Sequence, residues 1–205
     1  MVKVTVLVEG GGDDNSLKSR AAAGLRKLIE KLGLKNRPAI EFLGGRDEVY
    51  KRFCREVDRP REPRLYLLLV DSEEEVPYAT NDHPRWHHLA SRDKWQRPSA
   101  NVTDAHLHFM VTAMETWIVA DKNAIRDRFP ADYRDVISDG TRFESLSKST
   151  VLDLLQRATN RNEREGRYKK GVISFELLAR VNPDTLRKNC PHAHRFFEEL
   201  ERHLG

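Results

Sequence analysis

The sequence has only two cysteines in 205 residues, Cys54 and Cys190, and they lie far apart in the chain. This sparse pair argues against a disulfide scaffold, offers no metal-ligand spacing and fits a reducing compartment. A chain of this length can bury a core without a disulfide or a structural metal.

Long hydrophobic runs are also absent. The first apolar stretch, VKVTVLV at residues 2–8, is followed at once by Glu9 and three glycines. It is too short for a signal peptide or for a membrane span. We therefore expect a cytoplasmic protein with no membrane partner.

Several common functional motifs are missing as well. The glycines at 10–12 do not form GxGxxG, and no lysine with serine or threonine follows at P-loop spacing. There is no GxSxG, HExxH or CxxC pattern either. The chain itself should therefore not bind ATP in a P-loop.

The charge is mixed, with 36 basic and 32 acidic residues and a net charge of +4. A surface of this kind is compatible with a nucleic-acid partner but does not require one.

The first half of the chain alternates between strand and helix patterns. The unbroken apolar run at 65–70 is typical of a strand buried on both faces of a parallel sheet. Periodicity predicts strands at 2–8, 39–43, 65–70 and 106–111, and helices at 16–34, 47–57 and 84–91. Residues 113–121 fit either a helix start or a continuing strand.

The second half is mostly helical, with helices predicted at 147–159, 173–180, 183–188 and 191–204. The βαβαβ order predicts an α/β fold with a parallel sheet flanked by helices. We expect an α/β core over residues 1–125 and a helical C-terminal extension over 126–205, packed on the same domain.

Carboxylates follow two of the predicted parallel strands. Glu9 comes directly after the first strand, and Asp71 and Glu73 come after the buried one. Functional groups gather at the carboxyl ends of such strands, and converging carboxylates repel unless a cation lies between them. Oxygen ligands favour Mg²⁺ or Mn²⁺. The alternative is that these acids are ordinary helix caps and solvated turns.

The segments VTVLVEG at 4–10 and LLLVDSE at 67–73 resemble the TOPRIM fold of topoisomerase, primase and overcoming-lysogenization-defect nuclease domains. That pattern has a glutamate after the first strand and Asp-x-Asp after the third. Glu9 and Asp71 match it, whereas Glu73 stands where aspartate is usual. The resemblance implies a TOPRIM-like sheet over roughly residues 2–120 and a divalent metal at these acids.

The whole chain further resembles a group of bacterial TOPRIM-related proteins often encoded beside ABC- or SMC-type ATPases, in settings suggestive of phage defence. The segments that carry this resemblance are VEGGGDDNSLKSR (8–20), LLLVDSEEEV (67–76), MVTAMETWIVAD (110–121) and KKG (169–171). It implies a Mg²⁺-dependent nuclease, a hydrolase acting on nucleic acid with a partner ATPase. The alternative is a non-catalytic module that binds and regulates an ATPase or nucleic acid. The oligomeric state is left open.

Glu115 follows the strand predicted at 106–111 and is a candidate ligand for a second metal. Alternatively, it caps a helix while Trp117 packs in the core. Asp121 is expected at the surface. His106 and His108 alternate as some zinc ligands do, but isolated histidines are the commoner case.

Basic residues form a third group of candidates. Lysines or arginines in a loop with Tyr168 suit a nucleic-acid backbone, and a lysine there could neutralise a phosphoryl transition state. The alternative is a solvated loop. The predicted nucleic-acid contacts are Lys18, Arg20, Arg161, Arg164, Arg167, Lys169 and Lys170, of which Lys169 and Lys170 are also candidate catalytic residues.

Overall fold

The computed structural model describes residues 2–58, 64–76, 84–159 and 168–205. Its centre is a sheet of four parallel strands in the order β2-β1-β3-β4. The strands are β1 (Lys3–Val8), β2 (Ala39–Phe42), β3 (Arg64–Asp71) and β4 (Leu107–Met110). The predicted α/β class with a parallel sheet flanked by helices is confirmed, and this sheet is consistent with a TOPRIM-like fold.

Both faces of the sheet are buried, as the apolar run at 65–70 predicted. Val6 and Leu69 belong to the core on one face, whereas Leu7 and Leu68 belong to the core on the other. Successive strand residues point to opposite faces, so an unbroken apolar run supplies two cores at once.

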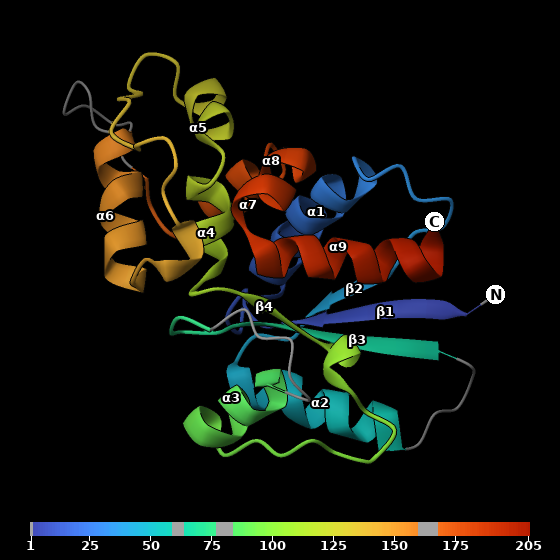
Figure 1. Cartoon of the computed structure of the whole chain (residues 1–205). Helices are drawn as coiled ribbons and strands as arrows, with labels where there is room; N and C mark the ends of the chain where they lie inside the picture. Colours follow the sequence, from blue (N-terminus) through green and yellow to red (C-terminus); the bar gives the residue numbers. More distant parts are fainter. Residues whose placement is uncertain (1, 59–63, 77–83, 160–167) are drawn as a thin grey trace.

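Helices cover the two faces unequally (Figure 1). Helices α2 (Arg46–Asp58) and α3 (Pro84–Asp93) lie on one side. The opposite side carries α1 (Asn15–Glu30), α4 (Met114–Val119), α5 (Lys122–Arg128), α6 (Lys148–Ala158), α7 (Val172–Leu178), α8 (Pro183–Asn189) and α9 (Pro191–Leu204). Short 3₁₀ turns occur at Asp104–His106 and Phe143–Ser145.

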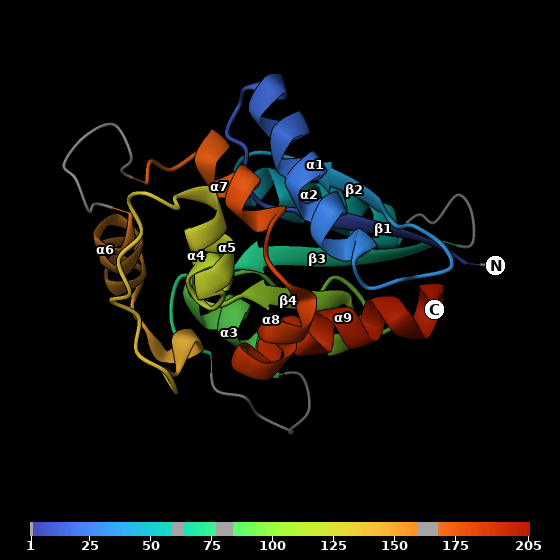
Figure 2. The same ribbon diagram turned by 90° about the horizontal axis from the view of Figure 1, so that it is seen from above.

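The helical C-terminal part shares its core with the sheet. Trp117 of α4 stacks against Phe196 of α9 with ring centroids 6.1 Å apart. Figure 2 shows α7 beside α1, and α9 running along the sheet toward the N-terminus. The division expected between residues 125 and 126 falls inside α5, and it stays a prediction.

Two local expectations differ from the structure. The first helix ends at Glu30 rather than near residue 34, and Gly33 follows with a φ of 69°. Asp121 is buried rather than at the surface, because its side chain caps α5 and accepts a hydrogen bond of 2.8 Å from the Asn182 backbone N–H. Nowhere in the described ranges is a helix long and apolar enough to cross a membrane.

Candidate functional site

The carboxyl ends of the four parallel strands meet at one edge of the sheet. Glu9 directly follows β1, and its backbone N–H donates to Leu69 O of β3 at 3.1 Å. Asp71 is the last residue of β3. Because β1 and β3 are neighbours, Glu9 and Asp71 lie at the same edge, as their positions in the sequence led us to expect.

The glycine loop after Glu9 brings backbone close to this edge. Gly10 and Gly44 exchange backbone hydrogen bonds of 2.9 and 3.0 Å. Gly11 has a φ of 81°, and a Cβ there would lie 2.9 Å from the Lys18 Cα. Only glycine tolerates such a conformation and such a contact without strain.

Arg46, at the start of α2, fixes the position of Glu9. Its Nη1 donates to Glu9 Oε2 at 2.7 Å and to the Asp71 backbone carbonyl at 2.6 Å. Asp93 holds the guanidinium from another side through bonds of 2.8 and 2.7 Å, and the centre of the Trp95 ring lies 5.0 Å from it. Burial raises the pKa of Glu9, and the charge of Arg46 opposes that rise.

Asp71 is the central carboxylate of the edge. Its Oδ1 accepts a hydrogen bond of 2.9 Å from the Met114 backbone N–H, at the start of α4. Burial and repulsion from Glu9 and Glu115 raise the pKa of Asp71 to about 8, against the influence of nearby lysines. A bound cation would relieve this repulsion.

Glu73 is held by a lysine that follows it by 75 residues. Lys148 Nζ donates to both carboxylate oxygens of Glu73, at 2.6 and 2.7 Å, and lies 3.9 Å from Asp71 Oδ2. Burial lowers the pKa of Lys148, but the bond to Glu73 and the surrounding carboxylates raise it by more. Glu73 also has a φ of 66°, an uncommon backbone conformation for a residue with a side chain.

Glu115, in the first turn of α4, is fully buried. The Tyr168 hydroxyl donates to its Oε1 at 2.9 Å and lies 2.7 Å from Ser174 Oγ. Lys170 Nζ is 3.7 Å from the same Oε1, while the other oxygen, Oε2, has no hydrogen-bond partner in the described structure. Burial and the charge of Glu115 raise the pKa of Tyr168, so its hydroxyl keeps its proton.

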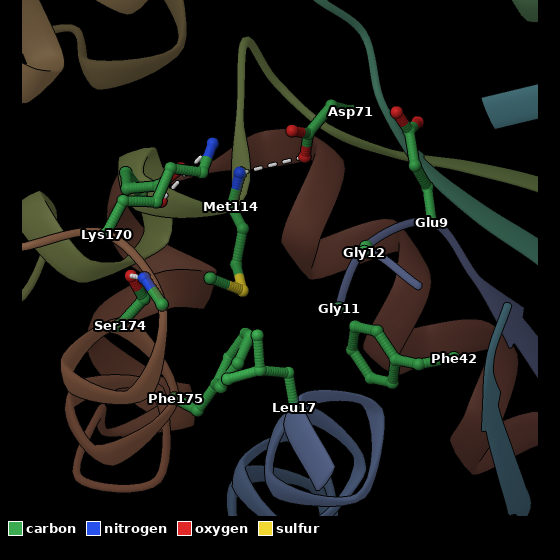
Figure 3. A pocket seen from close by; sticks show the side chains of 13 residues that line it. Glu9, Gly11, Gly12, Leu17, Phe42, Asp71, Met114, Lys170, Ser174 and Phe175 are labelled. Carbon is green, nitrogen blue, oxygen red and sulfur yellow. Dashed lines mark hydrogen bonds and ion pairs between the residues drawn. The ribbon is translucent and has the colours of Figure 1, made fainter. Parts of the chain in front are cut away.

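A cavity of about 210 Å³ opens at this edge of the sheet. Glu9, Asp71 and Lys170 stand along one part of its rim, and apolar side chains fill the opposite wall (Figure 3). The lining is Glu9, Gly10, Gly11, Gly12, Leu17, Phe42, Asp71, Met114, Glu115, Lys170, Gly171, Ser174 and Phe175.

The predicted site residues therefore divide into three groups. Glu9, Asp71, Glu115 and Lys170 line the cavity, and Glu73 joins them through Lys148. Three other candidates do not line the cavity. Lys18 lies against the glycine loop, and Arg20 lines a separate hollow between α1 and α7. Lys169 is exposed and outside the cavity lining. Arg161, Arg164 and Arg167 lie outside the described residues.

The structure adds three residues that the sequence patterns did not single out: Arg46, Lys148 and Tyr168 in its role as a partner of Glu115. Arg46 follows the carboxyl end of β2, so the rule that led to Glu9 and Asp71 could have found it as well. No local signal marks Lys148, because its partner is distant in the sequence.

The edge offers oxygen ligands, but among the described residues no three His, Cys, Asp or Glu side chains are grouped so as to hold a metal ion. His108, considered for zinc, is buried instead, and its Nε2 lies 3.0 Å from the Ala105 carbonyl. The donor chemistry nevertheless fits a hard divalent cation, because Asp71 has an unfavourable charge environment and Glu115 Oε2 is buried without a partner.

Comparison with known proteins gives one family. The family described as "Domain of unknown function (DUF4276)" matches residues 8–201, a range that includes every residue of the cavity lining. No curated protein and no solved structure matches the chain.

Proposed function

The chain belongs to the DUF4276 family, whose description names no reaction, and we propose from the site that it is a metal-dependent enzyme that cleaves phosphodiester bonds in nucleic acid. The observation that carries the proposal is a cavity that three carboxylates and one lysine side chain line together. Glu9, Asp71 and Glu115 line it together with Lys170. In metal-dependent phosphodiester cleavage, a metal and a positive side chain can both stabilise charge on the phosphate, and this edge offers candidates for both.

Glu9, Asp71 and Glu115 are the candidate ligands for Mg²⁺ or Mn²⁺, with Glu73 as a further one. To share one ion, their side chains would have to turn closer together than they stand in the structure. When bound, such an ion activates water and stabilises charge on a phosphoryl oxygen. Arg46 and Tyr168 orient two of these carboxylates by hydrogen bonds of 2.7 and 2.9 Å. Their role is positioning, because each acts through the carboxylate that it holds.

Lys170 would neutralise charge that develops on the phosphate. Its side chain is 59% exposed and its Nζ is 3.7 Å from Glu115 Oε1, so it reaches the cavity while staying accessible to a ligand. The glycine loop opposite lets a phosphate approach the backbone closely.

A second candidate is a non-catalytic module that regulates an ATPase or binds nucleic acid. It is favoured by the cations that already engage the acids, since Arg46 pairs with Glu9 and Lys148 pairs with Glu73. A partner ABC- or SMC-type ATPase and a role in phage defence, in either case, rest on the sequence resemblance alone.

The test is cleavage of matched DNA, RNA and tRNA substrates by the purified chain in Mg²⁺, Mn²⁺ or EDTA. We expect cleavage only with metal, and its loss in Glu9→Gln and in Asp71→Asn. The control is Glu48→Gln, an exposed acid on α2 that pairs only loosely with Lys51 at 3.4 Å. Full activity in EDTA, or in the Glu9→Gln/Asp71→Asn double variant, would rule the mechanism out.

Folding of these variants must be checked alongside. Asp71→Asn removes a charge from a repelling cluster, so it should leave the free energy of unfolding equal or higher without metal, as chemical denaturation would show. Glu9→Gln also removes the partner of Arg46, so it should be less stable than Asp71→Asn. The amide oxygen that Asp71→Asn introduces can still accept a hydrogen bond from the Met114 N–H. Loss of activity in a variant that is also unstable would not test the metal-binding role of the acid. Asp71→Asn keeps its hydrogen bond to the Met114 N–H, so it is the more informative of the two variants.

Substitution of Lys170 distinguishes the enzyme from the regulatory module. In the enzyme, Lys170→Ala should reduce cleavage and weaken nucleic-acid binding more at low salt than at high salt. Lys169→Ala should do less, because Lys169 lies outside the cavity lining. If both variants bind and cleave nucleic acid normally but associate less with a partner ATPase, the regulatory module is the better account.

A further inference from the structure

The cavity has two chemically different parts. The charged rim carries Glu9, Asp71 and Lys170, whereas the remaining wall is apolar. Figure 3 shows four apolar side chains turned toward the same space, away from the carboxylates; they are Leu17, Phe42, Met114 and Phe175. A phosphodiester backbone is polar and would use only the rim. The apolar wall therefore needs an apolar part of the ligand.

Two phenylalanines are the main apolar surfaces of this wall. Phe42 ends β2 and Phe175 lies in α7, and their rings meet edge to face with centroids 6.5 Å apart. Both are largely buried, with exposed fractions of 7% and 8%, and both line the cavity. Nucleobases stack on such rings without regard to their sequence, because every base has an apolar face.

The glycine loop joins the two parts. A Cβ on Gly10 would lie 3.5 Å from the Phe42 ring, and no atom lies within 4 Å of where a Cβ on Gly12 would be. The loop is thus closely packed beside the ring and open beyond it. A sugar–phosphate could pass over Gly12 and connect a base at Phe42 with a phosphate at the rim.

We propose that the apolar wall binds the base of an unpaired nucleotide while the adjoining phosphate lies at Glu9, Asp71 and Lys170. The substrate class is therefore single-stranded nucleic acid, or a nucleotide flipped out of a duplex. A paired base is stacked between neighbours and cannot enter a cavity of about 210 Å³ without leaving its helix. The cleavage step rests on the proposed function, whereas binding of the base does not.

The experiment uses the full chain in Ca²⁺, which can bridge a phosphate and carboxylates, and in EDTA. The probe is an oligonucleotide with one 2-aminopurine, made as DNA and as RNA, single-stranded and as a blunt duplex. Transfer of the base from its neighbours in the strand to the apolar wall should change the fluorescence of the single strand. Phe42→Leu and Phe175→Leu keep the apolar volume but lose the ring, and each should weaken binding by about fivefold or more. The control is Phe129→Leu, a phenylalanine that is 6% exposed but lies outside the lining.

Three results would overturn the inference: no binding of the single strand, binding without a fluorescence change, or an equal loss in Phe129→Leu. Failure of this inference can be distinguished from failure of the proposed function. Base binding without cleavage in any metal removes the nuclease and keeps the nucleotide pocket. Duplex cleavage that is unaffected by Phe42→Leu and Phe175→Leu keeps the nuclease and removes the pocket.

Discussion

Single residues at the edge of the sheet serve more than one partner at a time. Asp71 accepts from the first turn of α4 with one oxygen and lies 3.9 Å from Lys148 with the other. Arg46 bonds to Glu9, Asp71 and Asp93 with one guanidinium. Such shared groups couple the loops that follow different strands, so a substitution at one acid should shift the positions of several others.

Tyr168→Phe tests one of these links directly. Glu115 is fully buried, and the Tyr168 hydroxyl is the donor closest to its Oε1 among the described groups. Removing that hydroxyl leaves a buried carboxylate oxygen without its hydrogen bond, so the free energy of unfolding should fall by about 1–3 kcal/mol. Urea denaturation at neutral pH measures this.

The matched control is Tyr133→Phe, whose hydroxyl donates to the exposed Asp135 at 3.2 Å. A bond on the surface exchanges readily with water, so its loss should change stability by less than about 0.5 kcal/mol. Equal losses in the two variants would mean that Glu115 does not depend on Tyr168.

The individual acids could be predicted from the sequence, whereas most of their partners could not. Glu9 and Asp71 each follow a recognisable strand, and the ends of parallel strands share an edge. Lys148 reaches Glu73 across 75 residues, and Tyr168 reaches Glu115 across 53. Pairings over such distances depend on how helices pack, which periodicity does not encode.

At the scale of elements, the strongly patterned segments were predicted well and the short ones were not. The strands at 39–43 and 65–70 and the helix at 191–204 appear within about a residue of their expected limits. Helix α5 was not predicted, because its seven residues hold too few apolar positions to show a period. Because this helix was not predicted, its N-cap, Asp121, was expected at the surface.

The contact between α1 and α7 yields an element-scale prediction through Gly24→Ala. Alanine is favoured over glycine in a helix by about 1 kcal/mol. A Cβ on Gly24, however, would lie 2.6 Å from the Phe175 backbone carbonyl, which cannot move without shifting α7. Overpacking costs about 1–3 kcal/mol, so we expect a net loss of stability in urea denaturation.

Gly45→Ala is the control for this prediction. No atom lies within 4 Å of a Cβ at Gly45, and its φ is not in the left-handed region. Its free energy of unfolding should therefore stay within about 0.5 kcal/mol of the parent. If Gly24→Ala is as stable as Gly45→Ala, α1 and α7 do not approach as closely as the structure has them.

At the scale of the whole molecule, stability should depend on pH through a buried histidine. His192 is 4% exposed, and its Nε2 donates to the Val76 carbonyl at 3.2 Å. Burial lowers the pKa of His192 to about 4. Between that value and its ordinary pKa of about 6.5, the unfolded chain binds a proton that the folded chain does not. The contribution of His192 to stability is therefore lost as the pH falls through this window. The raised pKa of Asp71, about 8, acts in the opposite direction, so the effect of His192 is read from a comparison with a variant.

The measurement compares the parent with His192→Gln by urea denaturation between pH 7 and pH 4. The parent should lose up to about 3 kcal/mol more than the variant over this range. His194→Gln is the control, because the His194 side chain is 44% exposed and its pairing with Glu198 is long, at 3.6 Å. Parallel pH profiles for the parent and His192→Gln would refute the assignment.

The cavity also has a consequence for synthesis of the protein on the ribosome. Its walls come from segments that lie far apart in the sequence, with Glu9 and Phe42 in one and Lys170 and Phe175 in the other. The sheet strands emerge first, but α7 cannot close the cavity against α1 until residues 172–178 have been translated. A nascent chain, or one truncated before α7, thus lacks the complete pocket.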